Sequence, residues 1–198
     1  MIDVFAFNGY PVAVLGLGRS GLSAAKALHE SGAKVWGWDD NETSRKIAAD
    51  MDIPLIDLNT CDWSQCPTLV LSPGIPHTFP APHPIAAAAR EAKVEIICDI
   101  ELLARSQRLS SYIGITGTNG KSTTTALIGH ILLITGKQAE IGGNFGIPAM
   151  DLKPLGETDL YVLEMSSYQL ERTVSLTYDF AVLLNISADH LERHGGMD

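Results

Sequence analysis

Short runs of apolar residues alternate along the whole chain with stretches of helical spacing. Seven of these runs are predicted to be β-strands, at residues 12–15, 34–38, 68–71, 94–97, 112–115, 160–163 and 180–184. Such alternation is typical of βα units built around parallel sheets. The run at 160–163 is apolar at every position, as expected of a strand covered on both faces. The pattern therefore predicts an α/β fold.

Composition narrows the range of functions. The 198 residues are 45% apolar and carry a formal net charge of −9, so the chain can bury a core but lacks the Lys and Arg that a general nucleic-acid binder needs. No apolar stretch approaches the roughly 18 residues of a membrane span, and residues 1–10 carry no Lys or Arg ahead of their apolar residues, so we expect a soluble, unexported protein. Cys61, Cys66 and Cys98 form neither a CxxC pair nor an even set, which favours a reducing cytoplasm over a disulfide framework or a zinc site.

The first of two glycine-rich turns follows the first predicted strand. Gly16, Gly18 and Gly21 form a GxGxxG pattern that opens a helix, so the backbone can turn tightly and approach a diphosphate. Asp39 and Asp40 follow the second predicted strand, where a Rossmann-type carboxylate meets a ribose hydroxyl. This indicates a nucleotide diphosphate, with a dehydrogenase cofactor as the default. Two simpler interpretations stay open: the glycines could serve only to let the turn close, and Asp40 could be a solvated turn residue.

The second glycine-rich turn, at residues 114–123, is a P-loop in all but one respect. Ile115 stands where the strict GxxxxGK[ST] pattern has its first glycine. Backbone N–H groups can still form a nest for phosphate oxygens, Lys121 can neutralise the β and γ phosphates, and the Ser122 hydroxyl can bind Mg²⁺, with Thr123 as the alternative. The predicted ATP-binding residues are Gly117, Thr118, Asn119, Gly120, Lys121, Ser122 and Thr123.

Polar residues follow two later predicted strands. Glu164 ends the run at 160–163, where a buried carboxylate is costly unless it faces a cation; a solvated strand end is the alternative. His190 follows the strand at 180–184, and is either a ligand of a second Mg²⁺, a substrate contact or an ordinary surface residue. Together the two turns predict a Rossmann-like parallel-sheet domain at residues 1–106 and a P-loop ATPase α/β domain at 107–198, divided by the polar stretch that follows a short helix at 99–105.

These motifs together resemble the Mur ligases, ATP-dependent amide-bond ligases of peptidoglycan synthesis. The family's GTNGK[ST] pattern stands at residues 117–122. Further stretches resemble the branch of the family that adds D-glutamate: residues 16–21, 72–76, 99–102, 142–144, 164–171, 185 and 189–191. They occur in the family's order and cover nearly the whole chain.

The resemblance implies that the first domain holds UDP-N-acetylmuramoyl-L-alanine rather than NAD. It implies substrate contacts by Gly18, Arg19, Ser20, Asp39, Asp40, Ser72, Pro73, Gly74, Asn144 and His190. It also implies magnesium ligands at Ser122, Glu164 and His190, and catalytic roles for Lys121, Glu164 and His190. At Asn41 relatives often carry a basic residue. ATP and Mg²⁺ are the implied cofactors, D-glutamate is the second substrate, and the implied enzyme is a cytoplasmic monomer that binds no nucleic acid and no membrane.

The implied reaction has two steps. The L-alanyl carboxylate attacks the γ-phosphate of ATP to give an acyl phosphate, and the amine of D-glutamate then displaces phosphate. In the family the central sheet continues past the His190 motif, a carbamylated lysine follows, and a third domain supplies adenine and D-glutamate contacts. The resemblance therefore implies an incomplete P-loop domain and an absent C-terminal domain, in a fragment that does not turn over alone and that associates through an unpaired sheet edge.

Three other readings are kept. The first is an NAD-binding oxidoreductase or regulatory domain, which GxGxxG with Asp39 would also fit. The second is a non-catalytic module whose P-loop acts as a sensor or assembly element. The third is a related ligase acting on folate or on another muramoyl intermediate, because the GTNGK[ST] loop is shared.

Overall fold

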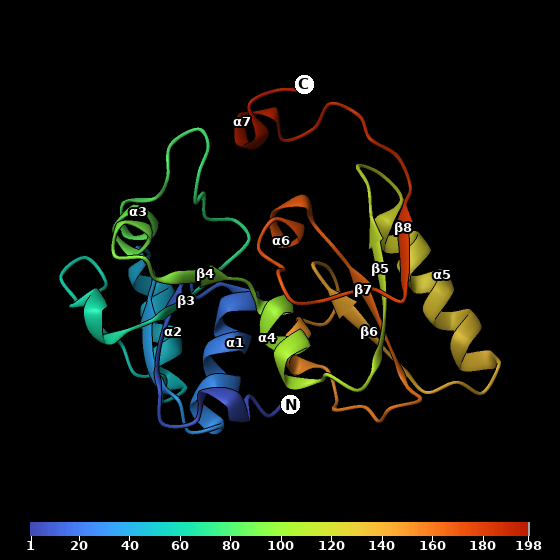
Figure 1. Ribbon diagram of the computed structural model, residues 1–198, viewed down its shortest axis with the longest axis horizontal. Coiled ribbons are helices and arrows are strands. Elements are labelled where there is room, and N and C mark those ends of the chain that lie inside the picture. Colours follow the sequence, from blue (N-terminus) through green and yellow to red (C-terminus); the bar gives the residue numbers. More distant parts are fainter. Residues whose placement is uncertain (198) are drawn as a thin grey trace.

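The chain forms two parallel sheets of four strands each in the computed structural model, which describes residues 1–197 (Figure 1). Asp198, the last residue of the predicted second domain, lies outside the described residues. The first sheet has the order β2-β1-β3-β4 and comprises β1 (Pro11–Leu15), β2 (Lys34–Trp38), β3 (Thr68–Leu71) and β4 (Glu95–Ile97). The second has the order β6-β7-β5-β8 and comprises β5 (Ser111–Thr116), β6 (Ala139–Gly143), β7 (Leu160–Glu164) and β8 (Phe180–Leu183). The predicted α/β fold with two parallel sheets is confirmed.

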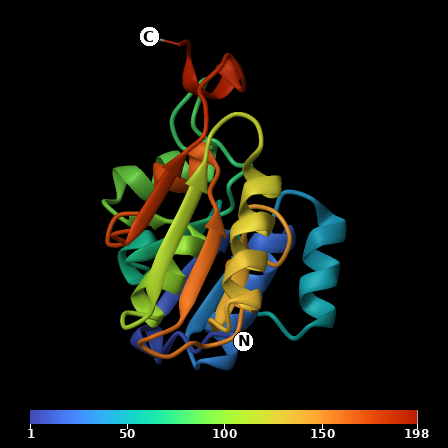
Figure 2. The same ribbon diagram turned by 90° about the vertical axis from the view of Figure 1, so that its right-hand side faces the viewer.

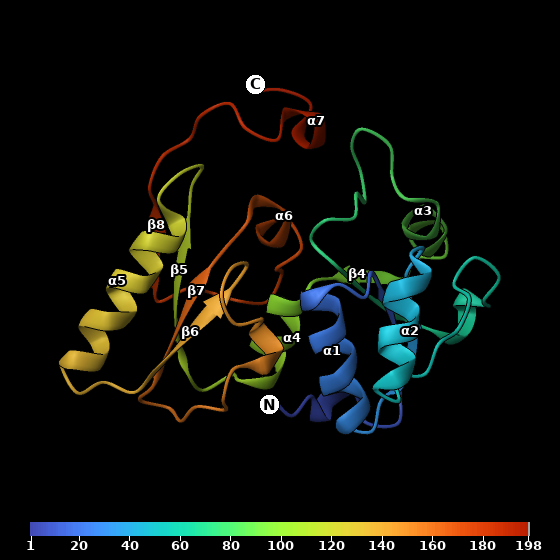
Figure 3. The same cartoon turned by 180° about the vertical axis from the view of Figure 1, so that it is seen from behind.

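Helices cover both faces of the first sheet. Successive residues of β1 point to opposite sides, so Val12 and Val14 join the core beneath α1 (Arg19–Glu30), whereas Ala13 and Leu15 join the core beneath α3 (Pro84–Glu91). The helix α2 (Glu42–Asp50) lies beside α1 in Figure 3. The carboxyl ends of β1, β2 and β3 meet at one edge of the sheet, where the turn after β1 leads into the N-terminus of α1.

The second sheet is covered differently on its two faces. Ile113, Ile115 and Val162 pack with α5 (Lys121–Ile134), which runs along the sheet in Figure 2. The rings of Tyr112 and Tyr161 stack on the other face, 5.3 Å apart, and belong to the same core cluster as Val12 and Val14. Two short helices, α6 (Ser167–Leu170) and α7 (Leu191–His194), follow the carboxyl ends of β7 and β8.

One continuous core joins the two sheets. The helix α4 (Asp99–Ser106) lies between them (Figure 1), and its Ile100 and Leu103 share a cluster with Leu163 from the second sheet and with Met150, which lies between β6 and β7. Three 3-10 helices complete the fold: η1 (Phe5–Phe7), η2 (Trp63–Gln65) and η3 (Ala149–Asp151). Because η3 packs on both α1 and α4, burial of apolar surface holds the two sheets in one arrangement.

The strand pattern differs from the prediction in one element and at several ends. β6 was not predicted, because Glu140 and two glycines interrupt its apolar residues; it forms by pairing along its whole length with β7. β4 begins at Glu95 rather than at 94, and β8 ends at Leu183 rather than at 184. Among residues 1–197, no helix is long and apolar enough to cross a membrane.

Candidate functional site

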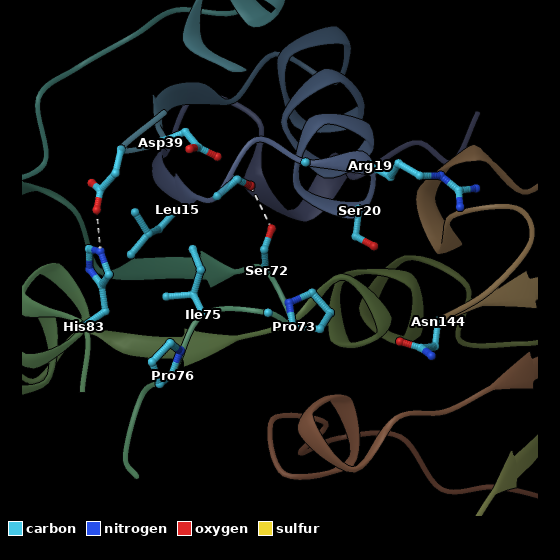
Figure 4. Close-up of a pocket in the computed structure, with 14 residues that line it drawn as sticks. Leu15, Arg19, Ser20, Asp39, Ser72, Pro73, Ile75, Pro76, His83 and Asn144 are labelled. Carbon is cyan, nitrogen blue, oxygen red and sulfur yellow. Dashed lines mark hydrogen bonds and ion pairs between the residues drawn. The ribbon is translucent and has the colours of Figure 1, made fainter. Parts of the chain in front are cut away.

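The first glycine turn is fastened to the loop that follows β3. Gly16 has a φ of +88° and donates its N–H to the Trp38 carbonyl at 2.8 Å. A Cβ at Gly16 would lie 2.8 Å from the Cβ of Ser72, so no other residue fits without displacing that loop. The Ser72 hydroxyl donates to the Gly16 carbonyl at 2.7 Å (Figure 4). The turn after β1 and the loop after β3 are therefore held together and form one continuous surface, called the floor of the site below.

A pocket of about 580 Å³ opens above this floor. It brings together nine of the ten predicted substrate residues: Gly18, Arg19, Ser20, Asp39, Asp40, Ser72, Pro73, Gly74 and Asn144. His190, the tenth, lies in a second pocket. Figure 4 shows Asp39 and His83 at one end of the first pocket, Arg19 and Asn144 at the other, and Ser72 and Pro73 between them. The pocket therefore suits an elongated ligand.

The two aspartates after β2 have different surroundings. Asp39 accepts the backbone N–H groups of Leu17, at 2.6 Å, and Asn41, at 2.8 Å, so its carboxylate holds the glycine turn in place. Asp40 lies 2.9 Å from the Nε2 atom of His83, and the hydrogen bond from His83 lowers the pKa of Asp40. Sequence reasoning missed His83, which is brought to the pocket by the start of α3, 43 positions away in the chain.

The second pocket, of about 510 Å³, surrounds the P-loop. Gly120 has a φ of +87° and turns the chain into α5, which begins at Lys121. The loop after β8 holds the P-loop, because Asn185 accepts the N–H groups of Thr118 at 3.0 Å and Asn119 at 2.9 Å. The Lys121 ammonium donates to the carbonyls of Gly117 and Thr118 at 2.7 and 3.0 Å, and so folds over the loop.

The predicted ATP residues are divided between the pocket and its surroundings. Gly117, Thr118 and Lys121 line the pocket. The others, Asn119, Gly120, Ser122 and Thr123, belong to the same loop or to the first turn of α5 but lie outside the lining. The sequence marks Asn185 as part of a family motif, but it does not show that this residue holds the P-loop by hydrogen bonds.

Glu164 and His190 occupy unlike environments. Glu164 is 3% exposed, and its carboxylate accepts a hydrogen bond from Asn144 at 3.1 Å. It forms no ion pair with a basic residue in the described part of the chain. His190 is exposed, lies in the second pocket and packs on Tyr168, with ring centroids 5.5 Å apart. Residues 1–197 bring no three His, Cys, Asp or Glu side chains together as a metal site.

Asn144 links the two pockets. It follows β6, and its backbone N–H donates to the Glu164 carbonyl at 2.9 Å, which ties it to the tip of β7. The residue lines both pockets. The two sites are therefore neighbours at the carboxyl ends of the two sheets, where ligands of parallel α/β sheets bind.

Comparison with known proteins gives the class of this chain. Residues 10–98 match the MurD-like N-terminal domain of the Mur ligases, and residues 115–198 match the Mur ligase middle domain. The chain therefore carries the N-terminal and middle domains of the Mur ligase family, as the sequence motifs predicted.

Within the family, the chain is similar to proteins named UDP-N-acetylmuramoylalanine–D-glutamate ligase. Those of Rhodospirillum rubrum and Caulobacter vibrioides are each 50% identical over the whole of this chain, which spans 43% of their length. The crystal structure of UDP-N-acetylmuramate-alanine ligase MurC from Thermotoga maritima matches 94% of this chain and 44% of its own, with a TM-score of 0.57 and 21% identity. The similarity to this crystal structure supports the fold of the present chain.

Proposed function

We propose that this chain is the part of a D-glutamate-adding ligase that binds UDP-N-acetylmuramoyl-L-alanine and ATP. The observation that carries the proposal is the position of Asn144, which lines both pockets. A substrate that extends along the first pocket ends beside this residue, and so reaches the pocket that contains the P-loop. Such an arrangement suits a transfer of phosphate from one ligand to the end of the other. Relatives with the corresponding name support the choice of substrates.

In this proposal residues 1–106 form the UDP-substrate domain and residues 107–198 the ATP domain. The N-terminus of α1 offers free N–H groups to the diphosphate, and Gly18, where a Cβ would meet no heavy atom within 4 Å, leaves room for its close approach. The uridine occupies the end of the first pocket near Asp39 and His83, and the muramoyl group the end near Asn144. Three free thiols are consistent with a cytoplasmic protein.

The residues around the P-loop also fit a magnesium ion. Ser122 supplies a hydroxyl at the start of α5, and Glu164 a buried carboxylate without an ion-pair partner among the described residues. Oxygen ligands of this kind are those that Mg²⁺ prefers. Ser122 and Glu164 would hold the ion, with His190 as a further ligand, and the ion would neutralise phosphoryl charge. Asn144 fixes the orientation of the Glu164 carboxylate through its hydrogen bond.

The proposed reaction needs no protein nucleophile. An oxygen of the L-alanyl carboxylate attacks the γ-phosphorus of ATP, and ADP leaves. The D-glutamate nitrogen then attacks the acyl carbon, phosphate leaves and the amine loses a proton. In this proposal the Lys121 ammonium, which donates to the carbonyls of Gly117 and Thr118, exchanges these partners for the phosphoryl group. The task of these residues is positioning and electrostatic stabilisation.

The ATP site can be tested with a fluorescent ATP analogue and Mg²⁺. We expect saturable binding by the unaltered chain and at least about tenfold weaker binding by Lys121→Ala, because the ammonium that pairs with the phosphates is lost. Lys137→Ala is the matched control, since Lys137 lies beyond the C-terminus of α5 and outside both pockets. Equal affinity of all three proteins for the analogue would contradict the assignment of the P-loop.

A further inference from the structure

Two arginines of the second domain bind the backbone carbonyls of residues 71–75, which comprise the last residue of β3 and the loop after it that lines the first pocket. We propose that Arg172 and Arg193 are positioning residues for this loop, so that the ATP-binding half of the chain sets the affinity of the other half for the UDP substrate. This inference rests on the proposed function, and it adds a role for residues that lie outside the first pocket.

Arg172 holds the first part of the loop. It is 2% exposed and follows α6 in the second domain. Its Nη1 atom donates to the carbonyls of Leu71 at 3.1 Å and Ser72 at 3.4 Å, and its Nη2 atom to that of Pro73 at 3.5 Å. Its Nε atom donates to the carbonyl of Tyr168 at 3.0 Å. The planar guanidinium thus spans from its own domain to the loop of the other.

Arg193 holds the rest of the loop. Its Nη1 atom donates to the carbonyl of Gly74 at 3.0 Å, and its Nη2 atom to that of Ile75 at 3.3 Å. Its guanidinium carbon lies 4.4 Å from the centre of the ring of Tyr168, a residue that lines the second pocket. Five successive carbonyls, from Leu71 to Ile75, are therefore bound by cations of the second domain.

Burying the charged side chain of Arg172 costs desolvation free energy, which an apolar side chain in the same place would avoid. A guanidinium removed from water needs charged or polar partners, and an apolar side chain would fill the same space without that cost. No carboxylate forms an ion pair with Arg172 among residues 1–197. The carboxylate of Asp99 lies nearby, where it accepts a hydrogen bond from Gln169 at 3.0 Å and offsets part of the charge of Arg172. The hydrogen-bond partners of the guanidinium itself, among the described residues, are backbone carbonyls.

The positive charge of Arg172 and Arg193 is expected to favour binding of an anion in the first pocket. Among the described residues that line it, Asp39 and Asp40 are acidic and Arg19 is the one Lys or Arg, so a diphosphate bound in this pocket lies near two carboxylates. The two arginines draw the partly negative carbonyls of the loop toward themselves and place positive charge behind the loop. Both effects favour an anion on the pocket side of the loop, and the burial of Arg172 reduces the screening of its charge by solvent.

Calorimetry of the full chain tests the proposal, with UDP-N-acetylmuramoyl-L-alanine and ADP as the two probes. For Arg172→Met we expect at least about tenfold weaker binding of the UDP substrate and ADP affinity within about twofold of the unaltered chain. Arg172→Lys keeps the charge but cannot bind several carbonyls at once, so its loss should be smaller. Hydrogen exchange in a peptide covering residues 71–76 should be faster in both variants, and unchanged in the P-loop.

A matched control separates positioning from stability. Arg105 also lies at the junction of the two sheets, where it pairs with Glu95 at 2.6 Å and Glu101 at 2.8 Å, but none of its side-chain hydrogen bonds or ion pairs in the described part of the chain reaches the loop. Arg105→Met should lower the melting temperature and leave the affinity for the UDP substrate unchanged. If Arg172→Met does not fold, Arg172→Lys and Arg193→Met decide the question.

The two failures are distinguishable. Binding of the UDP substrate within about twofold of the unaltered chain by the folded Arg172 and Arg193 variants would overturn the inference alone. Binding of ADP but not of the UDP substrate by the unaltered chain would overturn the proposed function and the inference with it.

Discussion

Replacing Gly21 by alanine is predicted to destabilise the chain although the site lies in a helix. A Cβ at Gly21 would lie 1.7 Å from the Gly16 carbonyl oxygen and 2.5 Å from the Ser72 hydroxyl, whereas real Cβ contacts under 3.0 Å essentially do not occur. Because the carbonyl belongs to the backbone of the glycine turn, no side-chain rotation relieves the overlap. The helix α1 would have to move away from β1 and from the loop after β3.

The size of the effect follows from three contributions. Overpacking a tight contact costs about 1–3 kcal/mol, and loss of the Ser72–Gly16 hydrogen bond about 1 kcal/mol. Alanine returns about 0.5–1 kcal/mol through its higher helix propensity. We therefore expect Gly21→Ala to lower the free energy of unfolding by about 1–3.5 kcal/mol, which corresponds to a melting temperature lower by roughly 2–14 °C in a chain of this size.

Urea unfolding followed by circular dichroism measures this difference. Gly18→Ala, in the same motif, is the matched control, because a Cβ there meets no heavy atom within 4 Å and the φ of Gly18 is −73°. Its urea midpoint should equal that of the unaltered chain. A Gly21→Ala variant as stable as Gly18→Ala would refute the close packing of α1 on the turn.

Three further predictions concern other parts of the chain. Burial raises the pKa of the Cys98 thiol to about 11, so at pH 8 iodoacetamide should modify the half-buried Cys61 first and Cys98 only in denaturant; early modification of Cys98, read by peptide mass spectrometry, would contradict this. Burial alone would raise the pKa of Glu101, but hydrogen bonds from backbone N–H groups and from an arginine outweigh burial and lower that pKa. The ionised Glu101 carboxylate therefore stabilises the folded chain above its unfolded pKa of about 4.3, and this stabilisation is lost as the pH falls through the lower pKa of the folded state. The melting temperature of Glu101→Gln should accordingly fall below that of the unaltered chain at pH 7, with a smaller difference at pH 3; equal differences would count against it. β8 is an edge strand whose Phe180 is 63% and Leu183 62% exposed, so the chain should self-associate through this edge. Analytical ultracentrifugation should show association that rises with concentration and that the double substitution Phe180→Lys with Leu183→Lys weakens. A monomer at high concentration would argue against association through β8.

Most of the fold could be predicted because its signals are local. A strand such as β7 is a continuous apolar run, and the turn after β5 is marked by its glycines and Lys121. β6 escaped prediction because its strand conformation depends on pairing with β7 rather than on its own residues. The join between the sheets was also beyond reach, because the packing of α4 between them depends on contacts that are distant in sequence.

The candidate site was predictable where its residues follow strands. Gly18, Asp39 and Ser72 follow three neighbouring strands, and parallel strands bring their carboxyl ends together. His83 and Arg172 were not predicted, since His83 reaches the pocket from the start of α3 and Arg172 contacts the loop beside it from the turn after α6, and both positions depend on tertiary packing. No local pattern distinguishes Arg172 from a surface arginine. Only its burial against the carbonyls of the other domain indicates its role.

Calorimetric titration with UDP-N-acetylmuramoyl-L-alanine, with NAD titrated in parallel, measures whether the first pocket binds a UDP-linked muramoyl substrate. We expect saturable binding of the UDP substrate, no binding of NAD, and loss of binding when Gly18 is replaced by leucine, which would fill the space beside the turn. Saturable binding of NAD without binding of the UDP substrate would show that the first pocket belongs to an NAD-binding domain instead.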